Sequence, residues 1–301
     1  MIQRLRDINP TIVVREAGLQ DGAQFVALFN KYYKRETNVE YFRWQFFNGP
    51  TISKLFLALD EGKLIGYYGV KIYELTNGTS AGFVIDLLVD EGYRKRGIAY
   101  LLNEEVVQFS NSHQASVMAG LPNAFGNASL NAMGWKTIAK IDDLVAADFE
   151  IASVPTALHN PGKSLVEFAR NENYRHWRFR ENPLYTYKEI CVDKNNYAVT
   201  KLFKNPSTDV VVNDLVDFKF DEISTFSVLL SRVLEQMKED KTKTITTWAL
   251  PHTAVFSFLT RAGFRISPQA RYFCLKLLDI NRSELYQIEN WNLVQADAEI
   301  Y

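Results

Sequence analysis

The sequence predicts an α/β protein made of two similar halves. Two observations lead to this prediction. Segments with strand and helix periodicity alternate along the chain, and at 84–109 a buried strand passes through a short basic loop into a helix. In addition, three short motifs of the first half recur in the second half in the same order.

The composition is typical of a globular protein with a large hydrophobic core. Its 301 residues are enough for two ordinary domains, and 47% of them are hydrophobic. A formal net charge of −1 offers no global basic surface for nucleic acid or for an anionic membrane. No apolar run is long enough to span a bilayer, and Met1–Pro10 is too polar for a signal peptide, so we expect a cytoplasmic protein.

Neither a metal site nor a disulfide is expected. Cys191 and Cys274 each stand alone in an apolar, strand-like context, which favours small buried side chains over a disulfide. The four histidines do not cluster at a spacing typical of metal ligands.

The residues before the central strand read as one strand, two helices and two further strands. Asp21, with Gln24 three residues later, forms a capping box that predicts a helix start, and Asn38 predicts the start of a second, aromatic-rich helix. Asn77-Gly78 is a strong hairpin signal that leads into the central strand. The predicted strands are Thr11–Val14, Lys54–Leu59 and Leu64–Leu75.

The central stretch predicts an anion site. Val84–Val89 is almost entirely apolar, which is typical of a strand buried on both faces, and Asp86 is the one carboxylate in it. A basic loop closed by Gly97 then leads to a helix at Ile98–Ser110. The first N–H groups of a helix have no internal partner and the helix dipole is positive there, so the loop suits a phosphate. Gly97 lets the backbone approach a diphosphate closely.

The rest of the first half alternates again between strands and helices. Pro122 marks the exit from a strand, and Gly134 ends the helix that follows. The predicted elements are a strand at Ala115–Gly120, a helix at Phe125–Met133 and strand-like segments at Trp135–Ala146.

The basic loop resembles the pyrophosphate loop of the GNAT superfamily, acetyltransferases that use acetyl-coenzyme A. It reads R-x-x-G-x-A at Arg94, Gly97 and Ala99, against the family pattern Q/R-x-x-G-x-G/A, and Val89 also matches. The order of predicted elements between Thr11 and Ala147 is that of the GNAT fold, which implies a mixed sheet. An ordinary strand–helix connection with solvated basic residues is the alternative.

The resemblance implies which residues hold the cofactor. Backbone groups at the end of the strand would grip the pantetheine arm, the loop would hold the pyrophosphate, and an Asn after the next strand would touch the arm. Core packing for the apolar residues and helix capping for the Asn are the alternatives. The implied residues are Leu87, Leu88, Val89, Arg94, Lys95, Arg96, Gly97, Ile98, Ala99 and Asn123.

Asp86 is the candidate general base. A carboxylate within a buried strand has its pKa raised by desolvation, which suits proton abstraction from an amine. The alternative is a hydrogen-bond anchor for a neighbouring loop, and Asp214 at the corresponding place in the second half favours it. Many GNAT enzymes carry a Tyr that protonates the leaving thiolate, but here Leu130 stands at that position, so the catalytic acid is left open.

The second half repeats the first in weakened form, which indicates an internal duplication. We therefore predict two tandem GNAT-like domains, 1–150 with the cofactor loop and 163–301 as a degenerate copy, joined by a linker at 153–164. The recurring motifs are Trp44-Gln-Phe46 as Trp177-Arg-Phe179, Val84-Ile-Asp86-Leu as Val212-Asn-Asp214-Leu, and Leu121-Pro122 before Gly134-Trp135 as Leu250-Pro251 before Gly263-Phe264.

The second domain is expected to lack a cofactor site. Its loop at Phe218–Ile223 has no glycine, and Asp221 and Glu222 would repel a diphosphate. One acetyl-coenzyme A is therefore expected per chain.

These observations predict an acetyl-coenzyme A-dependent N-acetyltransferase. Its acceptor would be a primary amine of a small molecule, such as an amino sugar or an amino acid derivative. A related acyl or aminoacyl transferase and a non-catalytic acyl-coenzyme A sensor or interaction module stay open as alternatives. The aromatic cluster at 41–47 either lines the acceptor pocket or packs in the core. We expect no metal, nucleic acid or membrane partner, and the sequence leaves the acceptor and the oligomeric state open.

Overall fold

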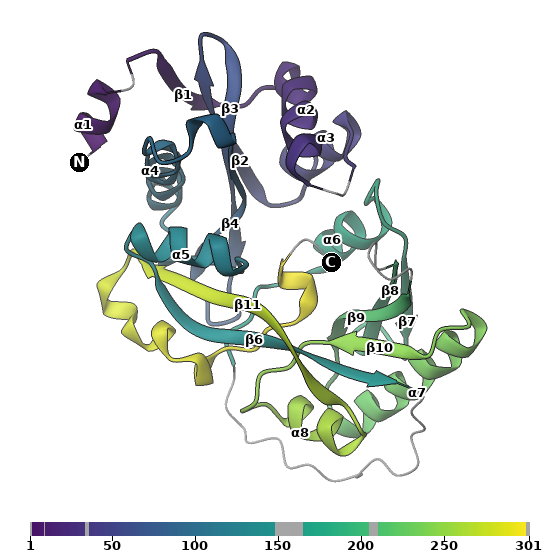
Figure 1. Cartoon of the computed structure of the whole chain (residues 1–301). Helices are drawn as coiled ribbons and strands as arrows, with labels where there is room; N and C mark the ends of the chain where they lie inside the picture. The colour runs from purple at the N-terminus through teal and green to yellow at the C-terminus, as the bar shows by residue number, and fades with distance from the viewer. Residues whose placement is uncertain (1, 9, 34–35, 148–164, 205–209, 299–301) are drawn as a thin grey trace. The chain divides into compact units, whose positions relative to one another are not determined.

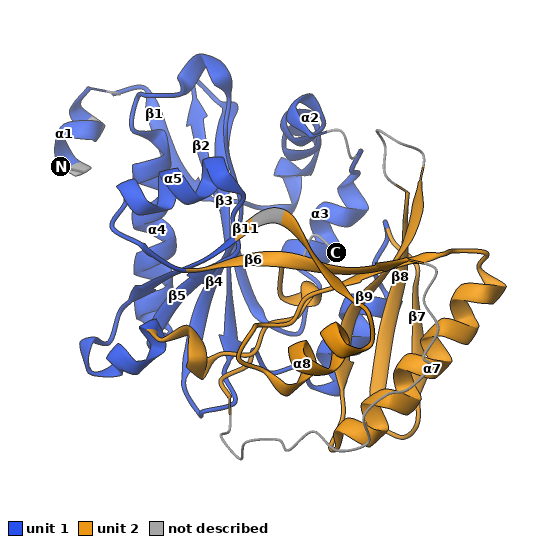
Figure 2. Ribbon diagram, turned by 60° about the horizontal axis from the view of Figure 1, so that its bottom comes forward, with its two compact units in different colours: residues 1–138, 168–184, 272–286 blue, residues 139–167, 185–271, 287–301 orange. Residues whose placement is uncertain are grey.

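The chain folds into two compact units that interleave along the sequence (Figures 1 and 2). The computed structural model describes residues 2–8, 10–33, 36–147, 165–204 and 210–298. Unit 1 comprises 1–138, 168–184 and 272–286, and unit 2 comprises 139–167, 185–271 and 287–301. Each unit therefore draws on both halves of the sequence. The division into sequence domains at 1–150 and 163–301 stays a prediction, and the whole of the proposed linker at 153–164 lies outside the described residues.

Unit 1 contains a mixed sheet. Its first four strands form an antiparallel meander, the fifth runs parallel to the fourth, and residues 274–277 of the last strand pair antiparallel with the fifth. The strands are β1 (Ile12–Glu16), β2 (Ile52–Asp60), β3 (Lys63–Glu74), β4 (Ser80–Val89), β5 (Val117–Gly120) and part of β11 (Arg265–Leu277).

Helices cover both faces of this sheet (Figure 1). Successive residues of β3 point to opposite faces, so Tyr67 and Tyr68 identify the two layers. Tyr67 contacts Phe25 of α2, whereas Tyr68 belongs to the core cluster that includes Ile98 of α4 and Leu130 of α5. The helices of unit 1 are α1 (Ile2–Asp7), α2 (Gly22–Tyr32), α3 (Val39–Phe46), α4 (Ile98–Ser112), α5 (Ala124–Ala132) and α6 (Glu172–Arg175), which runs on into a helical turn at His176–Arg180.

Most elements predicted for the first half are present with ends shifted by no more than two residues. The helix starts at Asn38 and Asn123 are confirmed, since each side chain accepts a backbone N–H of the first turn. The hairpin at Asn77-Gly78 is confirmed as well, with Gly78 at a φ of 80°. The short helix α1 was not predicted.

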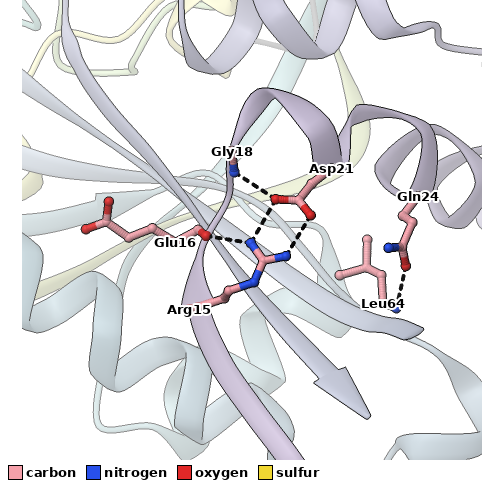
Figure 3. A network of polar contacts seen from close by, with 6 residues as sticks. All are labelled: Arg15, Glu16, Gly18, Asp21, Gln24 and Leu64. Carbon is pink, nitrogen blue, oxygen red and sulfur yellow. Dashed lines mark hydrogen bonds and ion pairs between the residues drawn. The ribbon is translucent and has the colours of Figure 1, made fainter. Parts of the chain in front are cut away.

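The predicted capping box at Asp21 and Gln24 is wrong (Figure 3). Both carboxylate oxygens of Asp21 accept from Arg15, at 2.7 and 2.8 Å, and one also accepts the N–H of Gly18 at 2.7 Å. Gln24 instead accepts the N–H of Leu64 at 2.9 Å. A bidentate, charge-assisted pair is stronger than a bond to a neutral backbone N–H. Asp21 therefore ties the start of α2 to β1 rather than capping the helix.

The recurring tryptophans Trp44 and Trp177 contact each other. Their rings stack with centroids 4.6 Å apart and planes at 16°. Trp44 Nε1 donates to the carbonyl of Trp177 at 3.0 Å, and Trp177 Nε1 donates to the carbonyl of Trp44 at 3.1 Å. Equivalent residues on the two-fold axis of a symmetric dimer make such reciprocal contacts. This geometry supports an internal duplication.

The aromatic cluster at 41–47 is mainly core. Tyr41, Phe42, Trp44 and Phe46 are buried, whereas Phe47 is 40% exposed. Core packing thus accounts for four of the five aromatic side chains.

Unit 2 repeats the strand pattern of unit 1. Three antiparallel strands, β7 to β9, are followed by β10 parallel to β9, and an antiparallel strand lies on the far side of β10. The elements are most of β6 (Lys136–Ala147), β7 (Tyr187–Cys191), β8 (Tyr197–Lys204), β9 (Val211–Lys219), β10 (Thr244–Thr247), the part of β11 before residue 272, α7 (Ile223–Glu239) and α8 (Ala254–Arg261). Short 3₁₀ turns lie at Ile280–Tyr286 in unit 1 and at Ile288–Asn290 and Gln295–Ala298 in unit 2.

The two cysteines differ in their surroundings. Cys274 is buried as expected, but Cys191 at the end of β7 is exposed, which corrects the expectation that both are buried. Among the residues that the structure describes, no helix is long and apolar enough to cross a membrane.

Candidate functional site

The parallel strands β4 and β5 pair only over a short stretch. Ala81, Gly82 and Phe83 pair with Val117, Met118 and Ala119, after which β5 ends at Gly120 while β4 continues to Val89. A side chain at Gly120 would place its Cβ 2.9 Å from a methyl of Val84, so glycine permits the close approach at this point. Residues 84–89 of β4 are therefore left without pairing to β5.

A β-bulge bends β4 at Asp86. Tyr67 pairs with Leu88 and Gly69 pairs with Ile85, so Asp86 and Leu87 together face the single residue Tyr68. Asp86 has a φ of 55°, a left-handed conformation that is uncommon outside glycine but tolerated by Asp. Such backbone strain concentrates at functional sites. The Asp86 side chain is half-buried, less enclosed than the sequence suggested.

The basic loop opens helix α4 with free backbone donors. Gly97 is the N-cap residue and has a φ of 82°. Its carbonyl accepts the N–H groups of Tyr100 and Leu101 at 3.0 and 3.2 Å. In the described parts of the chain, the N–H groups of Gly97, Ile98 and Ala99 have no hydrogen-bond acceptor. These donors and the helix dipole form a site suited to an anion.

Contacts with β4 and α2 hold the backbone of the basic loop in place. Arg94 Nε donates to the carbonyl of Val89 at 3.1 Å, and the guanidinium lies over the ring of Tyr32, 5.3 Å from its centroid. The Tyr32 hydroxyl accepts the N–H of Glu91 at 2.8 Å. Arg94 thus links the end of β4 to α2, a role in shaping the loop that the sequence did not reveal.

Two carboxylates hold the 3₁₀ turn at Glu91–Tyr93, which directly precedes the basic loop. Asp90 accepts from Lys31 at 2.8 Å and from the N–H of Gly92 at 3.2 Å, and the Lys31 ammonium holds the pKa of Asp90 below its usual range. Asp60 of β2 accepts from the Tyr93 hydroxyl at 2.8 Å. Both contacts fasten the turn to neighbouring elements of unit 1.

The N-terminal helix α1 lies against the loop. A Cβ built on Gly97 would lie 2.5 Å from a methyl carbon of Leu5. The side chain of Leu5 therefore covers this side of Gly97.

The residues predicted to touch the cofactor arm gather at one edge of unit 1. Leu87, Leu88 and Val89 end β4, and Asn123 follows β5. Because β4 and β5 are parallel, their carboxyl ends lie at the same edge, where α4 and α5 begin. Leu88 is buried, and Asn123 caps α5 by accepting the N–H of Gly126 at 3.0 Å. Packing and capping thus have direct support, and the cofactor roles stay predictions.

Leu130 is a core residue, and polar side chains cluster beside it. Asn127 Oδ1 accepts from Thr137 at 2.6 Å and from the thiol of Cys274 at 3.0 Å, and Asn131 donates to Thr137 at 3.0 Å. Burial raises the pKa of Cys274 to about 11, so its thiol stays neutral at physiological pH. The thiol therefore packs and donates a hydrogen bond rather than acting as a nucleophile.

Cys274 reaches this place through strand pairing. It pairs with Gly120, at the end of β5, although the two residues lie in different halves of the sequence. No local sequence signal predicts that contact.

Residues 23–130 match the family model described as "Acetyltransferase (GNAT) family". These residues form a GNAT-family domain. The match spans the divergence of β4 and β5, the bulge at Asp86 and the whole of the basic loop. A search of curated protein sequences finds no match to this chain.

Solved structures share the fold over most of this chain. A probable N-acyltransferase from Enterococcus faecalis V583 has 10% identity and a TM-score of 0.64, covering 90% of this chain and 73% of its own. A tandem GNAT protein from the clavulanic acid biosynthesis pathway has 15% identity and a TM-score of 0.54, covering 88% and 98%. The tandem GNAT-like fold predicted from the sequence is thereby confirmed.

A third similar structure belongs to a much larger protein. It is the GCN5-related glucosamine N-acetyltransferase region of a fungal multi-domain GH3 β-N-acetylglucosaminidase, with 12% identity and a TM-score of 0.56. The match covers 88% of this chain and 38% of that one, so this chain spans well under half of that protein. At such identities the likeness concerns the fold.

Asp214 in unit 2 does not occupy the place that Asp86 has in unit 1. In β9, Val199 pairs with Asp217 and Thr200 with Leu215, so the bulge falls at Val216. Asp214 thus precedes the bulge, whereas Asp86 lies within it, which corrects the equivalence drawn from sequence. The buried Asp214 carboxylate accepts from Thr246, and burial raises its pKa. The anchoring role of Asp214 therefore says nothing about Asp86.

Among the described residues, no group of three or more His, Cys, Asp or Glu side chains is placed to hold a metal ion.

Proposed function

We propose that this protein is an acetyl-coenzyme A-dependent N-acetyltransferase that acts on a primary amine of a small molecule, such as an amino sugar or an amino acid derivative. The observation that supports it most is the start of α4, where the N–H groups of Gly97, Ile98 and Ala99 are free next to a basic loop. This start lies in the part of the chain that matches the GNAT family. We propose that the protein acts in the cytoplasm.

The residues present fit the cofactor. A diphosphate needs free N–H donors, close backbone approach and no competing negative charge, and the loop at 94–99 offers these. Arg94, Lys95 and Arg96 would add positive charge, and the unpaired end of β4 at 87–89 would present backbone groups to the pantetheine arm. Asn123 would contact the same arm. Bound there, acetyl-coenzyme A supplies an activated acetyl thioester.

Asp86 is the proposed general base. It lies in the bulge at the point where β4 has left β5, and its left-handed backbone turns this residue out of the regular strand pattern. A carboxylate there can accept the proton that an acceptor ammonium must lose before it attacks. Leu130, at the position of the usual family acid, has no proton to give. Solvent or another group would then protonate the leaving thiolate.

The buried Leu130 also favours a second candidate, a non-catalytic acyl-coenzyme A sensor or interaction module. Such a protein binds the cofactor without transferring its acyl group. A related acyl or aminoacyl transferase would differ only in the group transferred.

The test uses the full chain in two assays. Calorimetric titration measures coenzyme A binding, and thiol release from acetyl-coenzyme A is followed against a panel of amino sugars and amino acid derivatives. Binding together with amine-dependent thiol release supports the proposal. Binding without release for any amine identifies a sensor, and the absence of binding overturns both.

A further inference from the structure

A pocket of about 470 Å³ lies in unit 2 where β9 ends and where α7 and α8 begin. Its lining includes Phe218–Ser224, Thr253 and Asn292, all of which belong to unit 2. This is the place of the loop that the sequence predicts for the second copy, Phe218–Ile223. A volume of this size suits a small molecule.

The charge of the pocket is negative. Glu167, Asp221 and Glu222 line it together with a single cationic side chain, Lys219. In the described parts of the chain, neither Asp221 nor Glu222 forms an ion pair. Neighbouring amides hold two of the carboxylates: Asn292 donates to Glu167 at 2.7 Å, and Asn196 donates to Asp221 at 3.1 Å. The neutral Asn196 amide fixes the direction of the Asp221 carboxylate without cancelling its charge.

Two of the backbone donors at this edge already have acceptors. The N–H of Asp221 donates to Asn196 at 2.9 Å, and the first turn of α8 is capped by Thr253, which accepts the N–H of Phe256 at 3.2 Å. The N-cap position of α7 is Glu222 itself, which places a negative charge at that helix start. A diphosphate would meet repulsion from Asp221 and Glu222 here.

The pocket wall also has an apolar side. The rings of Phe218 and Phe220 stack with centroids 6.2 Å apart and planes at 22°, and Ile223 and Val255 add aliphatic surface. Aromatic faces attract cations, and the apolar wall favours a hydrocarbon or aromatic body. Carboxylates beside such a wall match an amine that carries an apolar group.

We propose that unit 2 binds an organic monoamine with an apolar or aromatic body in this pocket, as a site separate from the one proposed for acetyl transfer. The ammonium group would face Asp221 and Glu222, and the body would lie along Phe218 and Phe220. This inference does not depend on catalysis in unit 1.

The test measures binding of 2-phenylethylamine to the full chain without cofactor. The neutral 2-phenylethanol and the anionic 3-phenylpropionate have similar bodies and serve as matched probes. Calorimetry is combined with hydrogen–deuterium exchange, because the exchange data locate the ligand even if the amine also enters unit 1. We expect the amine to bind more tightly than both probes and to protect residues 218–226.

Charge variants complete the test. Glu222→Gln should weaken amine binding by about tenfold, whereas the control Glu235→Gln removes one exposed carboxylate from the same helix outside the pocket and should leave binding unchanged. The proposal is overturned if the three probes bind alike, if protection appears only outside 218–226, or if both variants bind as the wild-type chain does.

Discussion

Replacing Gly97 by Ala separates the strain of the loop from its proposed role in binding. Gly97 has a φ of 82°, and a Cβ there would lie 2.5 Å from a methyl carbon of Leu5, a side-chain end that can shift. A residue with a Cβ in this conformation costs about 1–2 kcal/mol. Gly78→Ala is the matched control, because Gly78 has a φ of 80° and nothing lies within 4 Å of its Cβ position.

Both variants should lose about 1–2 kcal/mol in the free energy of unfolding, measured by urea denaturation. Coenzyme A affinity should fall only in Gly97→Ala, because only there does the added Cβ, through its strained φ and its clash with Leu5, shift the N–H groups that would hold a diphosphate. The expected loss is about tenfold or more, equivalent to ~1.4 kcal/mol of binding free energy, and calorimetric titration measures it.

Unchanged coenzyme A affinity in Gly97→Ala would refute the assignment of the pyrophosphate to this loop. An equal loss of affinity in Gly97→Ala and Gly78→Ala would trace the effect to general destabilisation instead. The first result would require a different anion site, and the second would remove the support that this variant gives to the loop.

Four further outcomes are expected. Asp86→Asn should lower turnover by roughly 10²–10⁴ with little change in coenzyme A affinity, and full activity would exclude a general-base role. Trp177→Phe leaves the buried carbonyl of Trp44 without its donor and should cost about 1–3 kcal/mol, and a double-mutant cycle with Trp44→Phe should show coupling rather than additive losses. Arg15 lowers the pKa of Asp21, so the stability from this pair should be present above the unfolded pKa of about 3.9 and lost as the pH falls through the lower folded pKa. Denaturation curves of Asp21→Asn should therefore converge with those of the wild-type chain in acid, and a constant difference at every pH would contradict this. Coenzyme A should titrate to about one per chain, and two equal sites would show that the second copy also binds it.

The sequence predicted most elements of unit 1 because their signals are local. Hydrophobic periodicity, an Asn cap and a turn dipeptide each act within a few residues, and the start of α4 follows from such signals. The basic loop was found for the same reason, since its donors and its glycine are adjacent in sequence. The failed capping box shows the limit: Asp21 had a second partner, Arg15, and the stronger charged pair decided its orientation.

Long-range pairing accounts for what the sequence did not predict. The bulge at Asp86 exists because two residues of β4 face Tyr68. The register between β3 and β4 determines this arrangement. Cys274 reaches Asn127 only because β11 pairs with β5. The repeat identified Trp44 and Trp177 as equivalent residues, but it did not show that they stack on each other.

The contribution of β11 to unit 1 sets a limit on when this protein can fold. Residues 272–286 are synthesised after nearly all of unit 2, yet they supply the strand beside β5. At about 5–20 residues per second, the ribosome needs on the order of ten seconds to pass from β6 to β11. During that interval one edge of β5 has no strand neighbour, and an open edge invites pairing with other chains. A prematurely terminated chain would therefore carry the whole basic loop and still lack a finished sheet. Residues 23–130, which match the GNAT family, are thus synthesised early, but their sheet is complete only after β11 has been synthesised.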